Sequence, residues 1–239
     1  MPLRPSYLIP TISSRISNTN TTFAFTPFCS RTMATTGTPS ATAQAQSDAQ
    51  ASSGAPASSH TFSSLDIKNT NIQTAPGVNL SDQQKVTIGS VLDLFEGHPT
   101  LPKFSLWSQD ATFTDNITVA TGYPKYTAQF YGLPALFKPI QLQHHRVTSA
   151  GNPIELEMSN KYVVKGIKKE QIMNSVVRIF VGQDGKIEKV EDRWNGKLPE
   201  GAISDAFRKL NAVTVPAFVK VPKNEEEDNK MKAEREKTS

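Results

Sequence analysis

The feature that most constrains this chain is a run of four strand-like segments with only short connections between them. Each segment alternates apolar and polar residues, which is the period of a half-buried strand. The four segments are 140–149, 154–166, 171–181 and 186–194. The turns at 150–153 and 182–185 are too short to hold a crossover helix. Consecutive strands joined in this way pair antiparallel, so the sequence predicts an antiparallel meander.

Helical patterns come before the meander. Ser81 and Gln84 form a capping box, after which apolar residues recur at helical spacing. These predicted helices are 84–96, 101–107 and 126–137, with a strand or short hairpin over 111–119. A final helix is predicted after the meander, over 204–210. Pro134 predicts a kink or an end in the third helix. Helices followed by a meander predict the α+β class, with helices packed on one face of a curved antiparallel sheet.

The two ends of the chain cannot supply a core. Residues 1–33 contain arginine, serine and threonine but no acidic residue, which is typical of a mitochondrial transit peptide. A disordered tail, or a true start at Met33 and a cytoplasmic location, is the alternative. Residues 34–65 are low in complexity, and residues 223–239 are charged without an apolar stripe, so both are predicted to be disordered. The folded domain is therefore expected over 66–222.

Several classes of function lack support in the sequence. The chain has one cysteine and no His–Cys spacing of the zinc type, so we expect no disulfide and no metal site. It has no phosphate-binding glycine loop and no nucleophile elbow, and we expect no cofactor. A formal charge of +4 is too small to indicate nucleic-acid binding. No apolar run of about 18 residues is present, so no membrane span is expected.

The order of elements resembles the NTF2-like superfamily, in particular its SnoaL-like and ketosteroid-isomerase-like members. The resemblance is carried by the segment 107–113, which enters the first strand, and by the Asp-Gly-Lys turn before the last strand, which ends at Trp194. It covers about 80–197 and is strongest to fungal members. It implies a cone-shaped α+β fold with a cavity between helices and sheet. This fold hosts enzymes, transport factors and dimerisation modules, so it implies no single function.

The resemblance to ketosteroid isomerase places Asp115 at the position of the general base. A carboxylate there could take a proton from a carbon next to a carbonyl group. The two oxyanion donors of the isomerase have no counterpart here, because the first helix has no Tyr and the strand position falls near Val177. Steroid isomerisation is therefore not expected. A turn residue bonded to its own backbone is the alternative role for Asp115.

A second group of residues is selected by strand alternation. His144 and Arg146 share a face with Ile140 and Leu142. If that face lines the cavity, His144 pairs with Asp115 as a second catalytic group, in a resemblance to scytalone dehydratase; a structural histidine is the alternative. The residues expected to line the pocket are Trp107, Tyr131, Arg146, Asp192 and Trp194. Core packing or an ion pair explains these five equally well.

Two functions remain open from the sequence. The first is a pocket protein that binds a small apolar or aromatic metabolite, with proton-transfer activity of the isomerase, dehydratase or cyclase type. The second is a non-enzymatic interaction module that forms a homodimer through the outer face of the sheet. A cavity of about 300 Å³ or more that contains Asp115 and His144 would favour the first. A cavity filled by Phe and Trp side chains would favour the second.

Overall fold

The computed structural model describes residues 60–196, 201–212 and 219–237. The predicted transit peptide, 1–33, and most of the predicted linker lie outside these residues. The described helices are α1 (Asp82–Phe95), α2 (Leu101–Phe104), α3 (Tyr123–Leu136), α4 (Ala202–Ala212) and α5 (Glu225–Lys237). The described strands are β1 (Trp107–Thr114), β2 (Val119–Thr121), β3 (Phe137–Ser149), β4 (Ile154–Val164), β5 (Glu170–Val181) and β6 (Ile187–Trp194).

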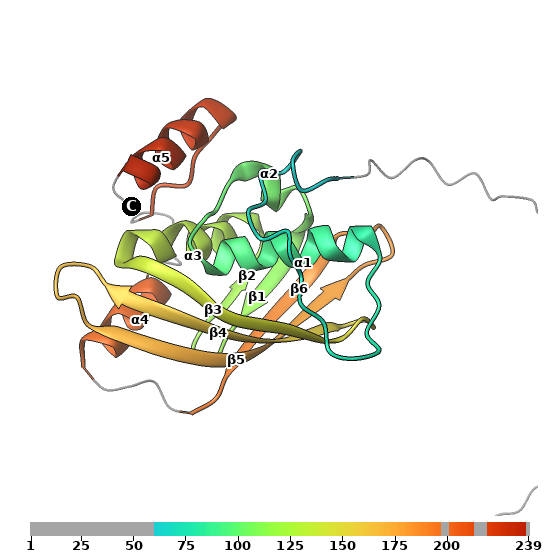
Figure 1. The fold of residues 1–239 in the computed structure, drawn as a ribbon. Helices are drawn as coiled ribbons and strands as arrows, with labels where there is room; N and C mark the ends of the chain where they lie inside the picture. The colour runs from blue at the N-terminus through green and yellow to red at the C-terminus, as the bar shows by residue number, and fades with distance from the viewer. Residues whose placement is uncertain (1–59, 197–200, 213–218, 238–239) are drawn as a thin grey trace, which may run out of the picture. The chain divides into compact units, whose positions relative to one another are not determined.

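The strands form one six-stranded sheet in the order β2-β1-β6-β5-β4-β3. The meander from β3 to β6 is antiparallel throughout, as predicted. The prediction of a wholly antiparallel sheet is corrected at one place, because β1 pairs with β6 in parallel. The last strand of the meander returns beside the first hairpin and runs in the same direction as β1. Figure 1 shows α1 and α3 over one face of this open, curved sheet. The α+β class and the packing of helices on a curved sheet are confirmed.

Helix α1 begins at the predicted capping box. Ser81 Oγ accepts a hydrogen bond from the Gln84 amide at 3.2 Å, and Gln84 Oε1 accepts from the Ser81 amide at 2.9 Å. Every residue from Val86 to Phe95 is buried, because the N-terminal segment crosses the side of α1 that faces away from the sheet. A Cβ at Gly89 would collide with the carbonyl oxygen of Asn69. The close crossing requires glycine at this point.

Two boundaries differ from the sequence-based expectation. Helix α2 ends at Phe104, and Trp107 is the first residue of β1 rather than the last of a helix. Helix α3 continues through Pro134 to Leu136. Pro134 lies in the last turn, so its missing N–H removes one hydrogen bond without interrupting the helix. No helix among the described residues is both long and apolar enough to cross a membrane.

The two ends of the described unit are more ordered than the composition predicted. Leu65, placed in the disordered linker by the sequence, is buried in the core. Residues Glu225–Lys237, predicted as part of a disordered tail, form α5. Asp228 of α5 is 3% exposed and accepts hydrogen bonds from the Tyr131 hydroxyl at 2.8 Å and the Leu101 amide at 2.6 Å. Because α5 docks chiefly through polar contacts, an apolar stripe could not reveal it.

Candidate active site

The cavity enclosed by the inner face of the sheet and by α1, α3 and α4 is called the cone pocket. Its lining residues are Phe95, Phe113, Asp115, Gln129, Phe130, Leu133, Met158, Asn160, Tyr162, Met173, Ser175, Asp192, Trp194, Phe207 and Leu210. Phe207 and Leu210 come from α4. The free space inside is about 20 Å³, which is room for about one water molecule.

Aromatic side chains fill most of the cone. Phe130 packs against Phe95 and Phe113 with ring centroids 5.7 and 5.1 Å apart. Phe207 packs on Tyr162 at 5.4 Å and on Trp194 at 6.0 Å. Edge-to-face and tilted packing of this kind is favourable in itself. The apolar part of the pocket is therefore closed by side chains in ordinary core packing.

Asp192 is the most perturbed carboxyl group in the cone pocket. Its side chain points inward from β6, is 6% exposed, and hydrogen-bonds to Ser175 of the neighbouring strand. Its Oδ1 has no hydrogen-bond partner among the described residues. Burial, with a smaller contribution from the negative charge of Asp115, raises the pKa of Asp192 to about 7. Asp192 therefore exchanges its proton near neutral pH, the range that suits a general acid.

Asp115 closes a backbone turn and also lines the cone pocket. Its Oδ1 accepts from the amides of Ile117 at 2.8 Å and Thr118 at 2.6 Å, which closes the turn between β1 and β2. The same side chain lines the cone pocket. Burial raises the pKa of Asp115, while the hydrogen bonds from Ile117 and Thr118 oppose that shift. A carboxylate fixed by its turn can still present its other oxygen to a ligand.

Neutral polar groups surround the two carboxyl groups. Asn160 is 1% exposed and its Nδ2 lies 3.3 Å from both the Phe95 carbonyl oxygen and the Tyr162 hydroxyl. Burial and the charge of Asp192 raise the pKa of Tyr162. Asn160 Oδ1 and Gln129 Oε1 have no hydrogen-bond partner among the described residues. Each such buried group costs about 1–3 kcal/mol, so with Asp192 they mark a place where a bound molecule would be stabilised.

His144 and Arg146 are not in the cone pocket, contrary to the expectation from alternation. Leu142 pairs with Asn160 and His144 pairs with Ser159, so one extra residue, Gln143, bulges from β3. A bulge shifts the phase of the strand and turns each later side chain to the opposite face. His144 is exposed. A His144–Asp115 pair therefore does not form in this structure.

Beyond the bulge, the side chains of β3 make contacts that hold the fold together. His145, now facing inward, is 9% exposed, and its Nε2 accepts from the Gln73 amide at 3.1 Å. Arg146 forms an exposed ion pair with Glu157 at 2.7 Å. His145 thus fastens the N-terminal segment to the sheet, the structural role that the sequence analysis left open for His144.

Trp107 and Tyr131 also lie outside the cone pocket. Trp107 is 1% exposed and stacks on Tyr126 with ring centroids 5.0 Å apart, which makes it a core residue. Tyr131 is buried against α5 through its hydrogen bond to Asp228. Of the seven residues selected from the sequence, the structure brings together Asp115, Asp192 and Trp194.

The sequence analysis missed the neutral polar residues of the site. Asn160 and Ser175 stand between apolar residues on the inward phases of β4 and β5. A polar residue at an inward position was the signal that could have identified both. Among the residues that the structure describes, no group of three or more His, Cys, Asp or Glu side chains is arranged to hold a metal ion.

This protein is similar to known proteins in structure but not in sequence. No protein-family model and no curated protein matches the sequence. The structure is similar to a steroid delta-isomerase from Pseudomonas aeruginosa, with 14% identity, 57% of this chain and 94% of that chain covered, and a TM-score of 0.43. It is also similar to an NTF2-like protein from Exiguobacterium, with 16% identity, 46% and 99% coverage, and a TM-score of 0.39.

A third similar structure has a ketosteroid isomerase-like fold. It comes from Catenulispora acidiphila, was solved in complex with trimethylamine, and has 14% identity, 44% and 82% coverage, and a TM-score of 0.38. Likenesses this distant assign no activity to the chain.

Proposed function

We propose that the cone pocket binds a small apolar or aromatic metabolite and catalyses proton transfer on it with two carboxyl groups. The observation that carries this proposal is Asp192, a buried carboxyl group with an unpartnered oxygen in the same pocket as a second carboxyl group. A buried carboxyl oxygen without a hydrogen-bond partner, as on Asp192, costs stability. Strongly perturbed carboxyl groups of this kind are concentrated at functional sites.

The surroundings of the two groups assign them different roles. Asp115 accepts two backbone hydrogen bonds, which favour its ionised form, so it acts as the base that removes a proton from carbon. Asp192 keeps its proton to about pH 7 and donates a hydrogen bond to the substrate oxygen on which negative charge develops. Two carboxyl groups whose environments separate their pKa values are suited to this division of acid and base.

Binding requires the pocket to open, because about 20 Å³ holds no metabolite. The cover is α4, whose inner row consists of Ile203, Ala206, Phe207 and Leu210. Displacement of Phe207 and Leu210 would expose Asp192, Trp194 and the aromatic walls behind them. The substrate is thus an apolar molecule with one carbonyl group, held where the two α4 side chains lie in this closed form.

The filled pocket also supports the second function, a non-enzymatic interaction module. The outer face of the sheet carries inter-strand ion pairs, Arg146–Glu157 at 2.7 Å and Arg178–Glu155 at 2.8 Å. These pairs are partly exposed and make the face polar. A polar face is compatible with contact with solvent and with contact with a second copy of the chain. The expected homodimer through this face stays a prediction, which sedimentation analysis of the full chain tests.

A ketone probe tests the proposed proton transfer directly. With 2-tetralone in D₂O, the full chain should accelerate exchange of the protons next to the carbonyl group, followed by NMR. Asp115→Asn should abolish the acceleration, and Asp192→Leu, which leaves no side-chain donor, should reduce it about 10²-fold, the effect of losing one oxyanion donor. Asp110→Asn removes a charge from an exposed position on β1 and serves as the control. Exchange that is unaffected by Asp115→Asn contradicts the proposal.

A further inference from the structure

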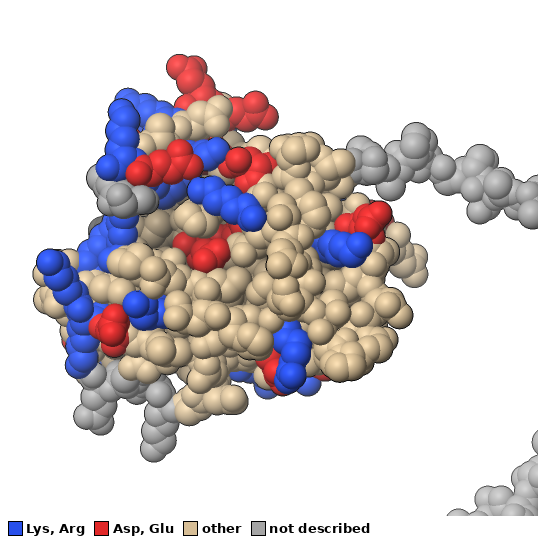
Figure 2. Space-filling model, viewed as in Figure 1, with Lys and Arg blue, Asp and Glu red and all other residues tan. Residues whose placement is uncertain are grey.

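The cone pocket and a larger hollow differ in how far the protein itself satisfies the polar groups that line them. The larger hollow, called the charged cleft, measures about 470 Å³ and is formed by the N-terminal segment, the end of α1, α2, the start of β3 and α5. Figure 2 shows blue and red side chains gathered around a hollow below α5. The two hollows share no lining residue, so each has its own set of polar groups.

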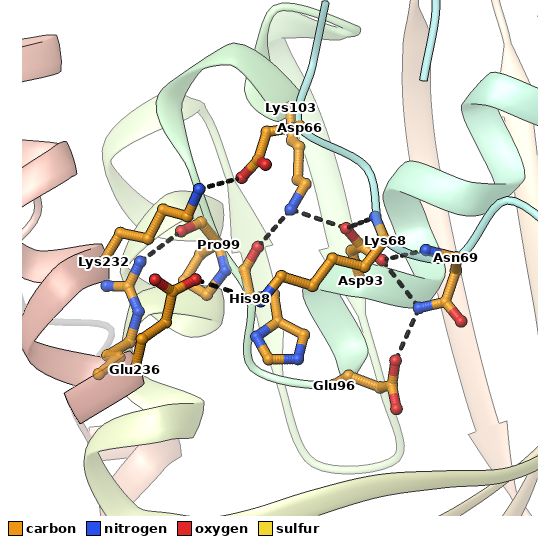
Figure 3. Close-up of polar contacts among 11 residues, drawn as sticks. Asp66, Lys68, Asn69, Asp93, Glu96, His98, Pro99, Lys103, Lys232 and Glu236 are labelled. Carbon is orange, nitrogen blue, oxygen red and sulfur yellow. Dashed lines mark hydrogen bonds and ion pairs between the residues drawn. The ribbon is translucent and has the colours of Figure 1, made fainter. Parts of the chain in front are cut away.

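A buried ion pair forms the floor of the charged cleft. Lys103 Nζ lies 2.8 Å from Asp93 Oδ2, and both side chains are 0% exposed (Figure 3). Lys103 also donates to the His98 carbonyl oxygen at 2.8 Å. Asp93 accepts from the amides of Lys68 and Asn69 at 2.9 Å each. Each charge of the floor therefore has partners within the protein.

Two partly exposed ion pairs form part of the rim of the charged cleft. Lys232 pairs with Asp66 at 2.6 Å. Lys68 pairs with Glu236 at 3.3 Å, and both side chains are labelled in Figure 3. The charges of the floor and of these rim pairs are satisfied within the protein, so they do not require a ligand.

The cone pocket, in contrast, contains buried acceptors without a donor. Asn160 and Gln129 are 1% and 2% exposed, and both line the pocket. Asn160 Oδ1 and Gln129 Oε1 have no hydrogen-bond partner among the described residues. An amide oxygen accepts hydrogen bonds, whereas an amide nitrogen donates them. The direction in which each amide is turned therefore decides what the pocket offers to a ligand.

The end of α1 fixes the orientation of the Asn160 amide. The Phe95 carbonyl lies in the last turn of α1, and Pro99, four residues later, has no N–H to donate to it. Asn160 Nδ2 donates to this carbonyl oxygen and to the Tyr162 hydroxyl oxygen, each at 3.3 Å. If the amide were turned around, its oxygen would face the Phe95 carbonyl oxygen, and two acceptors would meet. Asn160 therefore uses both N–H groups within the protein and keeps its oxygen as a free acceptor.

The Gln129 amide is oriented by a carbonyl group as well, but by one on the movable side of the pocket. Its Nε2 lies 3.4 Å from the Leu210 carbonyl oxygen of α4. Because α4 must move to open the pocket, Gln129 is held in this orientation only in the closed form. The partners of Asn160 lie in α1 and in its own strand, β4, so its oxygen remains an acceptor when α4 moves.

We propose that the substrate of the cone pocket carries, besides its carbonyl group, a hydroxyl or N–H group that donates a hydrogen bond to Asn160 Oδ1. This inference rests on the proposed function, because it takes the cone pocket as the substrate site. Asn160 is then a specificity-determining residue. A buried acceptor costs free energy until a donor reaches it. A substrate with an ether or a second carbonyl oxygen at this place leaves the acceptor unpaired and binds less tightly.

The test is the binding of ring-substituted 2-tetralones to the full chain, measured by isothermal titration calorimetry. The 5-, 6- and 7-hydroxy-2-tetralones present a donor at three positions of the ring. Unsubstituted 2-tetralone is smaller and the methoxy-2-tetralones are larger, and neither kind has a donor. At least one hydroxy ketone should bind about tenfold more tightly than both 2-tetralone and its own methoxy counterpart. The same hydroxy ketone should shift the side-chain amide signals of Asn160 in ¹⁵N NMR spectra.

Asn160→Leu removes the acceptor while keeping a side chain of similar size, so the preference for the hydroxy ketone should disappear. Asn174→Leu is the matched control, because Asn174 is exposed on β5 and does not line the pocket. It should leave the preference unchanged. Asn160→Leu also leaves the Phe95 carbonyl oxygen without its donor, so the variant is compared only through the ratio of its own affinities. If Asn160→Leu does not fold, the ratio and the Asn160 signals of the wild type decide the question.

Three results would overturn the inference. They are equal affinities for the hydroxy and methoxy ketones, Asn160 amide signals that do not respond to the hydroxy ketone, and a preference that survives in Asn160→Leu. Exchange of the ketone protons in D₂O is measured separately. A hydroxyl preference without accelerated exchange would contradict only the proposed proton transfer, whereas accelerated exchange without the preference would contradict only this inference.

Discussion

The cone pocket and the charged cleft place chemistry and space in different parts of the molecule. The cone pocket has the perturbed carboxyl groups but only about 20 Å³ of free space. The charged cleft has about 470 Å³, but most of its charges are bound to other protein groups. The first is closed by α4 through apolar packing, whereas α5 borders the second through polar contacts. A reactive group thus indicates where a substrate reacts, and volume indicates where a molecule fits without rearrangement.

The largest effect is expected at the floor of the charged cleft. Asp93→Asn leaves the Lys103 ammonium buried without its counter-charge, so the free energy of unfolding should fall by about 3–5 kcal/mol. Asp66→Asn breaks the partly exposed pair with Lys232 and should cost less than about 1 kcal/mol. Urea denaturation measures both. Equal effects would show that floor and rim do not differ as described.

Phe207→Ala should convert the closed cone into an open one. The loss of a buried aromatic ring costs about 3 kcal/mol, and the new cavity should accept benzene, which raises the melting temperature of the variant only. Arg208→Ala alters an exposed neighbour on α4 and should change stability by less than about 0.5 kcal/mol. Absence of benzene stabilisation would mean that α4 does not hold the cone closed.

The carboxyl pair predicts an unusual pH dependence of stability. Burial raises the pKa of Asp192 to about 7, above about 3.9 for an exposed aspartate. The folded protein therefore keeps a proton that the unfolded chain releases, so this group's contribution to stability falls as pH rises from about 4 to about 7. Asp192→Asn should remove that fall and be more stable than the wild type at pH 8, by about 2–4 kcal/mol. If the free energies of unfolding of the wild type and of Asp192→Asn changed in parallel with pH, the raised pKa of Asp192 would be contradicted.

The smallest loss of stability is expected at α5, which borders the charged cleft but not the cone pocket. Tyr131→Phe removes the hydrogen bond to Asp228 and should destabilise α5 docking by about 1.5 kcal/mol. Hydrogen exchange should then accelerate in α5 and leave the β5 and β6 amides around the cone unchanged. Tyr123→Phe, a second tyrosine of α3, is the control. Faster exchange around Ser175 and Asp192 as well would show that cleft and cone are coupled.

The sequence predicted the fold better than the site because alternation reports each strand's phase only while the strand is regular. In β5 and β6 the phase was correct, so Val177, Asp192 and Trp194 face inward as expected. In β3 the bulge at Gln143 left no mark in the sequence, and His144 was placed on the wrong face. The Asp93–Lys103 pair joins two helices through the fold, which no local pattern reveals.

The most direct test of the proposed chemistry is the titration of the Asp192 carboxyl carbon, followed by ¹³C NMR in the full chain. The structure predicts a midpoint near pH 7. It also predicts a lower midpoint in Asp115→Asn, because that change removes a nearby negative charge. A midpoint near 4 in the wild type, with no response to Asp115→Asn, would contradict the assignment of a proton-donating carboxyl group in the cone pocket.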